Sequence, residues 1–121
     1  MKKAKLFDDL QHYLKDLEDI LPESEEEFIE SKTVCYSVSM LMINIINTCL
    51  DLGSELINLK QLGYPENYRD IFTLLEQNKI LIKPLVNKMK DLVGLRNFLA
   101  HEYGTVDLEI LYEQAKDIKT V

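Results

Sequence analysis

The chain has 121 residues, 46% hydrophobic and 29% charged, which is enough for one domain with a real core and too short for two. Only four glycines and three prolines occur, which favours helices over a many-stranded fold and excludes a disordered chain. The net charge of −7 argues against a broad nucleic-acid-binding face, which needs lysine and arginine to neutralise phosphates, but it leaves room for a small basic pocket. We therefore predict a single all-α domain over residues 1–121.

The first half of the chain predicts two helices. Apolar residues at helical spacing predict a helix over residues 3–20, which Pro22 ends. Ser24 followed by Glu27 is a capping-box pattern, so a second helix begins there and runs to about Leu62, with or without a bend. The apolar residues expected along one side of this long helix are Val34, Val38, Leu41, Ile45, Leu52, Leu56 and Leu59.

The second half predicts two or three further helices. Residues 66–77 read as a short helix, and Pro84 suits the first turn of a helix that runs to about His101. Asp107 is a good N-cap for a last helix. The residues expected to point inward from the short helix are Tyr68, Ile71, Phe72 and Leu75. No strand is needed, so we expect an up-and-down bundle of four to five helices.

One segment raises the question of a membrane. Residues 33–50 carry no charge, and their length is near the lower limit for a span. The run nevertheless contains polar residues such as Ser37 and Asn44, and it stops at Asp51. We therefore expect a buried core helix or a dimer-facing helix and no membrane contact.

The two cysteines are not expected to form a disulfide. Cys35 and Cys49 fall on one predicted helix, separated by roughly 21 Å of rise, whereas a disulfide needs Cα atoms within about 7 Å. Reduced thiols in the core and the absence of a signal-peptide pattern predict a cytoplasmic protein. The cysteines and histidines lack the spacing of a zinc site, so we expect no metal.

Most of the chemical interest lies in residues 92–103. Met89, Leu92, Arg96, Leu99 and Tyr103 step by three and four, so they share one stripe of a helix. Arg96 interrupts this apolar stripe, and a charge without a partner against apolar surface is costly. The guanidinium therefore needs a partner or a function.

A second row of the same helix carries other polar side chains. Lys90, Gly94, Asn97 and His101 lie about 100° round from the Arg96 stripe, and the missing side chain at Gly94 would let another helix approach closely. Arg96 and His101 point about 140° apart, so one helix does not obviously aim both at one point. Two copies packed across a two-fold axis would bring both residues into one cleft. His101 lies in the last turn, where the helix dipole favours the imidazolium and hence proton donation.

Spacing alone also fits a purely structural reading. Arg96 could pair with a carboxylate of the long helix, such as Asp51. Asn97 and His101 could cap the helix end, and Tyr103 could simply pack against the preceding turn. One arginine and one histidine on a helix are common, so the spacing alone favours the structural reading.

The literal string points to a family. Arg96-Asn97-x-x-x-His101-x-Tyr103 resembles the R-x-x-x-x-H-x-Y motif of the HEPN superfamily, and it is most similar to the HepT-like toxins of MNT–HEPN toxin–antitoxin pairs. Three flanking segments resemble that family in order and spacing, namely Leu21-Pro22-Glu23-Ser24, Cys49-Leu50-Asp51 and Pro65-Glu66-Asn67-Tyr68. The resemblance covers the chain from about Leu10 to Tyr112.

The resemblance implies a homodimeric, metal-independent endoribonuclease without a cofactor, the toxin of a type II/VII-like toxin–antitoxin pair. By this resemblance Arg96 would contact the scissile phosphate, His101 would transfer a proton and Asn97 would orient His101 or the substrate. Tyr103 would be the tyrosine to which a cognate nucleotidyltransferase (MNT) antitoxin attaches AMP. The substrate is expected to be RNA, since the reaction needs the ribose 2′-hydroxyl.

Two alternatives stay open at this point. The chain could be a catalytically inactive HEPN dimer that binds a nucleotide or docks a nucleotidyltransferase partner. It could also be a plain helical dimer in which Arg96 and His101 only hold the interface.

Overall fold

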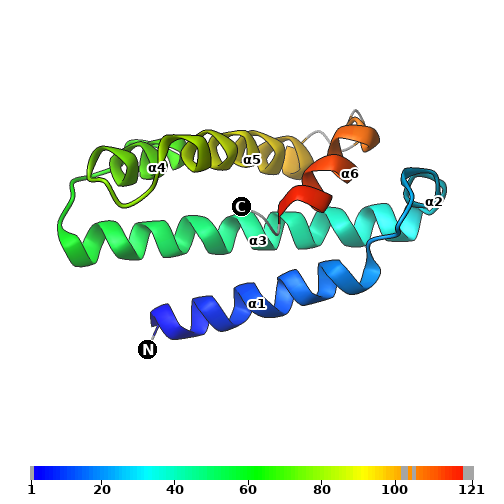
Figure 1. Cartoon of the computed structure of the whole chain (residues 1–121), viewed down its shortest axis with the longest axis horizontal. Coiled ribbons are helices and arrows are strands. Elements are labelled where there is room, and N and C mark those ends of the chain that lie inside the picture. The colour runs from blue at the N-terminus through cyan, green and yellow to red at the C-terminus, as the bar shows by residue number, and fades with distance from the viewer. Residues whose placement is uncertain (1, 102–103, 105, 119–121) are drawn as a thin grey trace.

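The computed structural model describes residues 2–101, 104 and 106–118. These residues form six helices and no strand (Figure 1), which confirms the all-α class. The helices are α1 (Lys2–Ile20), α2 (Glu25–Glu30), α3 (Lys32–Lys60), α4 (Tyr68–Gln77), α5 (Lys83–His101) and α6 (Leu108–Asp117). The expected number, four to five, is too low because one predicted helix is divided in two.

The single long helix predicted from Ser24 to Leu62 is wrong at Ser31. The backbone of Ser31 is extended, and its N–H donates to the Phe28 carbonyl, which ends α2. The Ser31 hydroxyl oxygen accepts the N–H of Val34 and thereby caps the start of α3. Ser24 caps α2 as predicted, by accepting the N–H of Glu27. Two serine caps seven residues apart thus produce a short helix followed by a long one.

The other predicted helix boundaries hold to within two residues. Asn67 caps α4 by accepting the N–H of Asp70, so this helix begins at Tyr68 instead of residue 66. Asp107 caps α6, as the sequence predicts, by accepting the N–H groups of Glu109 and Ile110. Side-chain oxygens at these positions satisfy backbone donors that have no partner inside the helix.

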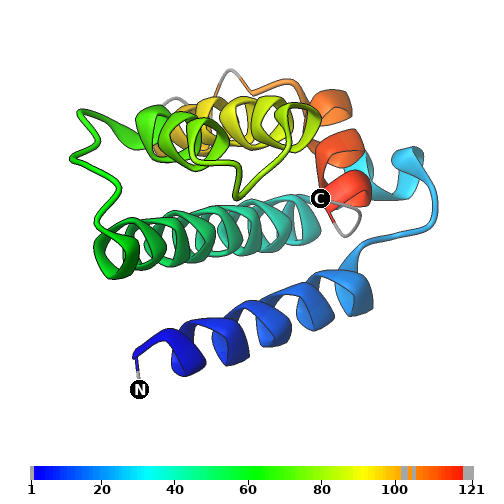
Figure 2. The same ribbon diagram turned by 60° about the vertical axis from the view of Figure 1, so that its left-hand side comes forward.

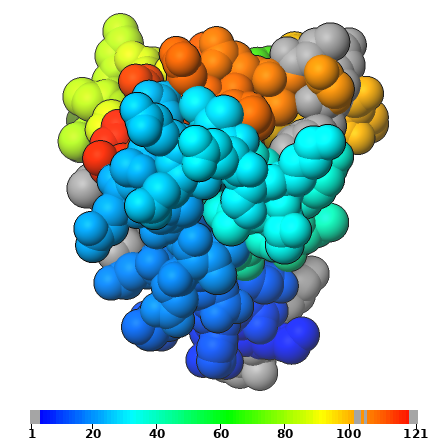
Figure 3. Space-filling view, turned by 90° about the vertical axis from the view of Figure 1, so that its right-hand side faces the viewer, coloured from blue at the N-terminus to red at the C-terminus, as the bar shows by residue number. Residues whose placement is uncertain are grey.

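Helix α3 forms the middle layer of the bundle. Helix α1 runs antiparallel to it on one side, and the pair α4 and α5 covers the opposite side (Figures 1 and 2). Helices α2 and α6 pack against each other at the end of the bundle where α3 begins, and Figure 3 shows this end. The central position of α3 explains its composition, since a helix covered on two sides needs apolar residues over most of its circumference.

The burial along α3 follows from this position. Its buried residues are Cys35, Val38, Ser39, Met42, Ile45, Ile46, Thr48, Leu50, Gly53 and Ile57. Leu59, which we expected on the apolar side of this helix, is 64% exposed because the last turn extends beyond the covering helices. Helix α3 is long and apolar enough to cross a membrane by length and composition alone. Its burial between α1 and α5 instead gives it the role of a core helix.

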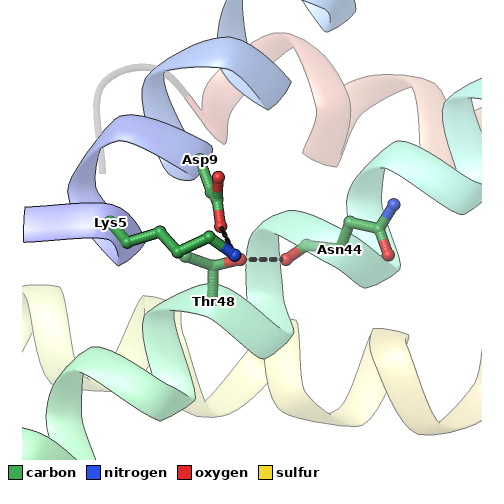
Figure 4. A network of polar contacts seen from close by, with 4 residues as sticks. All are labelled: Lys5, Asp9, Asn44 and Thr48. Carbon is green, nitrogen blue, oxygen red and sulfur yellow. Dashed lines mark hydrogen bonds and ion pairs between the residues drawn. The ribbon is translucent and has the colours of Figure 1, made fainter. Parts of the chain in front are cut away.

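Polar side chains in the uncharged run find partners within their own helix. The Thr48 hydroxyl donates to the Asn44 carbonyl at 2.7 Å (Figure 4). Figure 4 also shows Lys5 of α1, which pairs with Asp9 of the same helix at 3.9 Å. Within the described residues, no buried side-chain nitrogen or oxygen lacks a hydrogen-bond partner. The polar positions of this segment are therefore compatible with burial.

Phe28 connects α2 to the core. Its side chain is fully buried, and its ring centre lies 5.3 Å from that of Tyr112 on α6. The Tyr112 hydroxyl in turn donates to the Pro22 carbonyl at 2.8 Å, which ties α6 to the turn between α1 and α2.

We predict that Phe28→Ala lowers the free energy of unfolding by about 3–5 kcal/mol, because it removes a buried ring and leaves a cavity. Urea denaturation at equilibrium measures this loss. Tyr64→Ala is the control, since Tyr64 is 96% exposed, and it should change the free energy by less than about 0.5 kcal/mol. Equal effects of the two substitutions would contradict the placement of α2.

Candidate functional site

Arg96 is held between three helices. Its Nε donates to Oδ1 of Asn47 on α3 at 2.8 Å, and its Nη1 donates to Oδ1 of Asn97 at 2.8 Å. Its Cζ lies 5.1 Å from the centre of the Tyr68 ring on α4, which is a cation–π contact. The guanidinium is half-buried, as expected for a charge that interrupts an apolar stripe. Three contacts from three helices restrict it to one position.

Among the residues that the structure describes, Arg96 forms no ion pair with Asp51, the carboxylate partner considered from the sequence. Asp51 is exposed, and the α3 residue that meets Arg96 is Asn47, one helical turn earlier. An amide oxygen is neutral, so it orients the guanidinium without neutralising its charge. The same is true of Asn97. Arg96 is therefore fixed in place by groups that leave its positive charge available to a ligand.

Tyr68 was wrongly predicted to point into the core. It is 48% exposed and places its ring against Arg96, whereas Ile71, Phe72 and Leu75 are buried as expected. Its position in the first turn of α4 puts it beside the second half of α5. The sequence offered no signal for this contact, because residues far apart in the chain make it.

The hydrogen bond to Asn97 draws the Arg96 side chain toward the side of α5 that carries His101. On an ideal helix Arg96 and His101 diverge by about 140°, but the long arginine side chain reaches round to Asn97. Asn97 and His101 are four residues apart and lie on the same side of α5. His101 is exposed in the last turn. The structure thus gives Asn97 a role in positioning Arg96, which sequence reasoning did not foresee.

The space left by Gly94 is used by a side chain of α4. A Cβ atom at Gly94 would lie 2.9 Å from Nη2 of Arg69. We expected this glycine to let another helix approach closely, and the group that approaches it is the Arg69 guanidinium of α4. Sequence reasoning did not single out Arg69. Tyr103 lies outside the described residues.

Neither cysteine is placed as a nucleophile. Cys35 is buried, and its thiol donates to the Phe28 carbonyl at 3.1 Å. Burial raises the pKa of the Cys35 thiol, and it raises the pKa of the Cys49 thiol to about 11. Both thiols stay protonated near neutral pH. Within the described residues, no group of three or more His, Cys, Asp or Glu side chains could hold a metal ion.

Comparison with known proteins identifies the family. The family model described as "Ribonuclease HepT-like" matches residues 10–120. The chain belongs to the HepT-like ribonuclease family. The motif Arg96-Asn97-x-x-x-His101-x-Tyr103 lies within the matched region, and the resemblance read from the sequence is confirmed.

Individual relatives agree with this assignment. This HepT-like chain is 35% identical over 85 residues to the "mRNA nuclease HepT" of Shewanella oneidensis, a match that spans 70% of this chain and 64% of that protein. A solved structure of a tri-AMPylated HEPN toxin of Shewanella oneidensis in complex with MNT antitoxin superposes with a TM-score of 0.84 at 28% identity, over 98% of this chain and 97% of the other. A solved toxin–antitoxin with AMP-PNP gives a TM-score of 0.89 at 25% identity, over 98% and 92%.

We predict that both thiols of this HepT-like protein react slowly with iodoacetamide in the native state. With a pKa of about 11, only about one Cys49 side chain in a thousand is a thiolate at about pH 8. Mass spectrometry of the labelled protein should show rapid labelling in concentrated urea and little without it. Fast native labelling of Cys49 would contradict the desolvation that raises the pKa of its thiol.

Proposed function

We propose that this HepT-like protein is the toxin of a toxin–antitoxin pair and a metal-independent endoribonuclease. The observation that carries the proposal is the Arg96 guanidinium, which two neutral amide oxygens and the Tyr68 ring hold in one position. A cation fixed in this way is suited to bind a phosphate, because it keeps its charge and needs little rearrangement when the substrate arrives. Family membership supports the choice of RNA as the source of that phosphate.

Arg96 would act on the scissile phosphate. Attack of the ribose 2′-oxygen on phosphorus forms a pentacoordinate species whose non-bridging oxygens carry more negative charge than the ground state. A prepositioned guanidinium stabilises this additional charge more than it stabilises the bound substrate, which lowers the barrier. Asn47 and Asn97 would contribute by keeping Arg96 oriented.

His101 would supply proton transfer. The attacking 2′-hydroxyl loses a proton as its oxygen bonds to phosphorus, and the departing 5′-oxygen gains one as its bond to phosphorus breaks. An exposed imidazole in the last turn of α5 can reach a bound strand. Because the nucleophile is the 2′-hydroxyl, the substrate is RNA and not DNA.

A second copy of the chain would complete the site. Tyr36 and Met40 on α3 are 59% and 57% exposed, and they lie on the same helical stripe as Asn47, the partner of Arg96. These two side chains border Asp16, Asp19 and Ile20 of α1, and a two-fold partner that covers the stripe as far as Asn47 would place its own Arg96 and His101 next to the first pair. We therefore propose a homodimer with a composite cleft.

The antitoxin would be a nucleotidyltransferase of the MNT type. The solved relative in complex with an MNT antitoxin is a tri-AMPylated toxin, and this chain carries Tyr103 two residues after His101. Attachment of AMP to Tyr103 would add bulk and negative charge close to the catalytic motif and repel an anionic substrate. The pair would act in the cytoplasm, where RNA and the partner are both present.

We predict that the purified dimer cuts total RNA or tRNA in the presence of EDTA, and that Arg96→Ala and His101→Ala each lower the rate at least about a hundredfold. Gel analysis of the cleavage products measures the rate. His12→Ala is the matched control, since His12 is the other histidine of the chain and lies exposed on α1. It should leave the rate unchanged.

A folded, dimeric wild type that leaves RNA uncut would overturn the nuclease proposal. The inactive HEPN dimer would then be the better reading, and calorimetry with AMP and ATP would test whether the Arg96 site binds a nucleotide. Loss of dimer stability in Arg96→Ala, without any change in cleavage, would favour the purely structural role.

We predict that the inactive variants Arg96→Ala and His101→Ala recover activity when they are mixed. If each catalytic pair in the cleft combines Arg96 of one copy with His101 of the other, a mixed dimer contains one complete pair and the wild-type dimer contains two. Since about half of the dimers in an equal mixture are mixed, the mixture should reach about a quarter of the wild-type rate. The mixture must be refolded together or incubated until subunits exchange, which a tagged copy verifies. No recovery after proven exchange would assign both residues of a cleft to the same copy.

A further inference from the structure

Arg69 lies beside the proposed site but is not part of the motif that defines it. It follows Tyr68 in the first turn of α4, so the two neighbouring side chains reach different parts of α5. The Tyr68 ring contacts the Arg96 guanidinium, whereas Nη2 of Arg69 lies close to the backbone of α5 at Gly94. Arg69 is otherwise exposed to solvent.

Gly94 places Arg69 on the same row of α5 as the motif residues. Gly94 and Asn97 are three residues apart, and Asn97 and His101 are four apart, so the three lie along one side of the helix. Asn97 accepts a hydrogen bond from Arg96 on this side. Arg69, the Arg96–Asn97 pair and His101 are thereby aligned over about two helical turns, which is roughly 10 Å.

The exposed position of Arg69 makes its guanidinium accessible to a ligand. The nearest carboxylate in sequence, Asp70, is engaged at the start of α4, where its Oδ2 accepts the N–H of Glu66. Arg96 is oriented by neutral amides. Arg69 at Gly94 and Arg96 at Asn97 thus both place a guanidinium group against α5 in a chain whose net charge is −7, and positive charge placed locally in this way is what a phosphate backbone requires.

We propose that Arg69 binds a second phosphate of the RNA strand, next to the phosphate that Arg96 contacts. Successive phosphates of a strand are separated by several ångströms, which matches a row of cationic groups better than a single point. Arg69 would hold the strand in register along α5 and would take no part in proton transfer. This inference rests on the proposed nuclease function and adds a binding residue that the motif does not include.

The test measures RNA binding in a non-cleaving background. His101→Ala protein and its double variant with Arg69→Ala are titrated into a short fluorescent single-stranded RNA over a range of salt concentrations. We expect Arg69→Ala to weaken binding about tenfold at low salt and to reduce the slope of log Kd against log salt by about 0.7, the value for one lost phosphate contact. Arg69→Lys should retain most of the slope. Lys15→Ala, which removes the same charge from α1 on the other side of α3, should change neither quantity.

A second variant tests whether the position of the Arg69 guanidinium matters when its charge is kept. In Gly94→Ala the new methyl group would lie 2.9 Å from Nη2 of Arg69, so the guanidinium must move although no charge is lost. Alanine also favours a helix interior over glycine, so the urea midpoint should stay constant or rise. We expect RNA binding to weaken a few-fold in this variant while stability does not fall, a combination that a structural role of Gly94 would not produce.

The outcomes distinguish this inference from the function on which it rests. If the wild type neither binds nor cuts RNA, the nuclease proposal fails and the Arg69 proposal fails with it. If the wild type cuts RNA but Arg69→Ala binds with the same Kd and salt slope as Lys15→Ala, only the role of Arg69 is overturned. If Arg69→Ala lowers the urea midpoint and Arg69→Lys fails to restore binding, Arg69 is a structural residue.

Discussion

The molecule depends on covering helix α3 from two sides. Its uncharged first half exposes too much apolar surface to stand alone in water, and at about 25 cal/mol per Å² this surface provides much of the stability gained on folding. Helix α1 covers one side and the α4–α5 pair covers the other. One stripe of α3 carries the exposed Tyr36 and Met40 near its start and, further along, Asn47, which contacts Arg96 of α5. The proposed site and the proposed dimer surface both lie along that stripe.

The second constraint on the structure is that the charged Arg96 guanidinium lies half-buried at the border of the apolar core. A guanidinium that loses water must regain hydrogen bonds, and an unpartnered one would be strongly destabilising. Asn47, Asn97 and the Tyr68 ring meet this requirement without adding a negative charge. A carboxylate would have stabilised the fold in the same way but would have competed with a phosphate. The choice of amides over a carboxylate therefore supports the proposed phosphate-binding role of Arg96 over a purely structural one.

Net acidity and RNA binding are compatible in this chain because electrostatic attraction is local. Salt screens interactions beyond about 10 Å, so acidic residues on distant helices weigh little against cations at the site itself. The acidic cluster of residues 23–27 lies at the turn into α2 and in its first turn, where it also suits the helix dipole. Arg96 and Arg69 lie at the contact between α4 and α5. An unequal distribution of charge therefore lets a chain of net charge −7 carry two guanidinium groups at this contact.

Local patterns in the chain predicted the helical class, most helix boundaries and the family. Periodicity, capping side chains and the motif that contains Arg96, Asn97 and His101 are all found in short segments, so no tertiary contact is needed to recognise them. The prediction from the sequence misplaced the interruption at Ser31, where two competing caps lie close together, and it counted too few helices as a result. The packing of the helices, by contrast, decides that Asn47 and not Asp51 contacts Arg96. It also places Tyr68 outside the core, and it places the Arg69 side chain in the space at Gly94. Each of these contacts joins residues on different helices, and the relative rotation of two packed helices depends on how all their side chains fit together, which no single segment encodes.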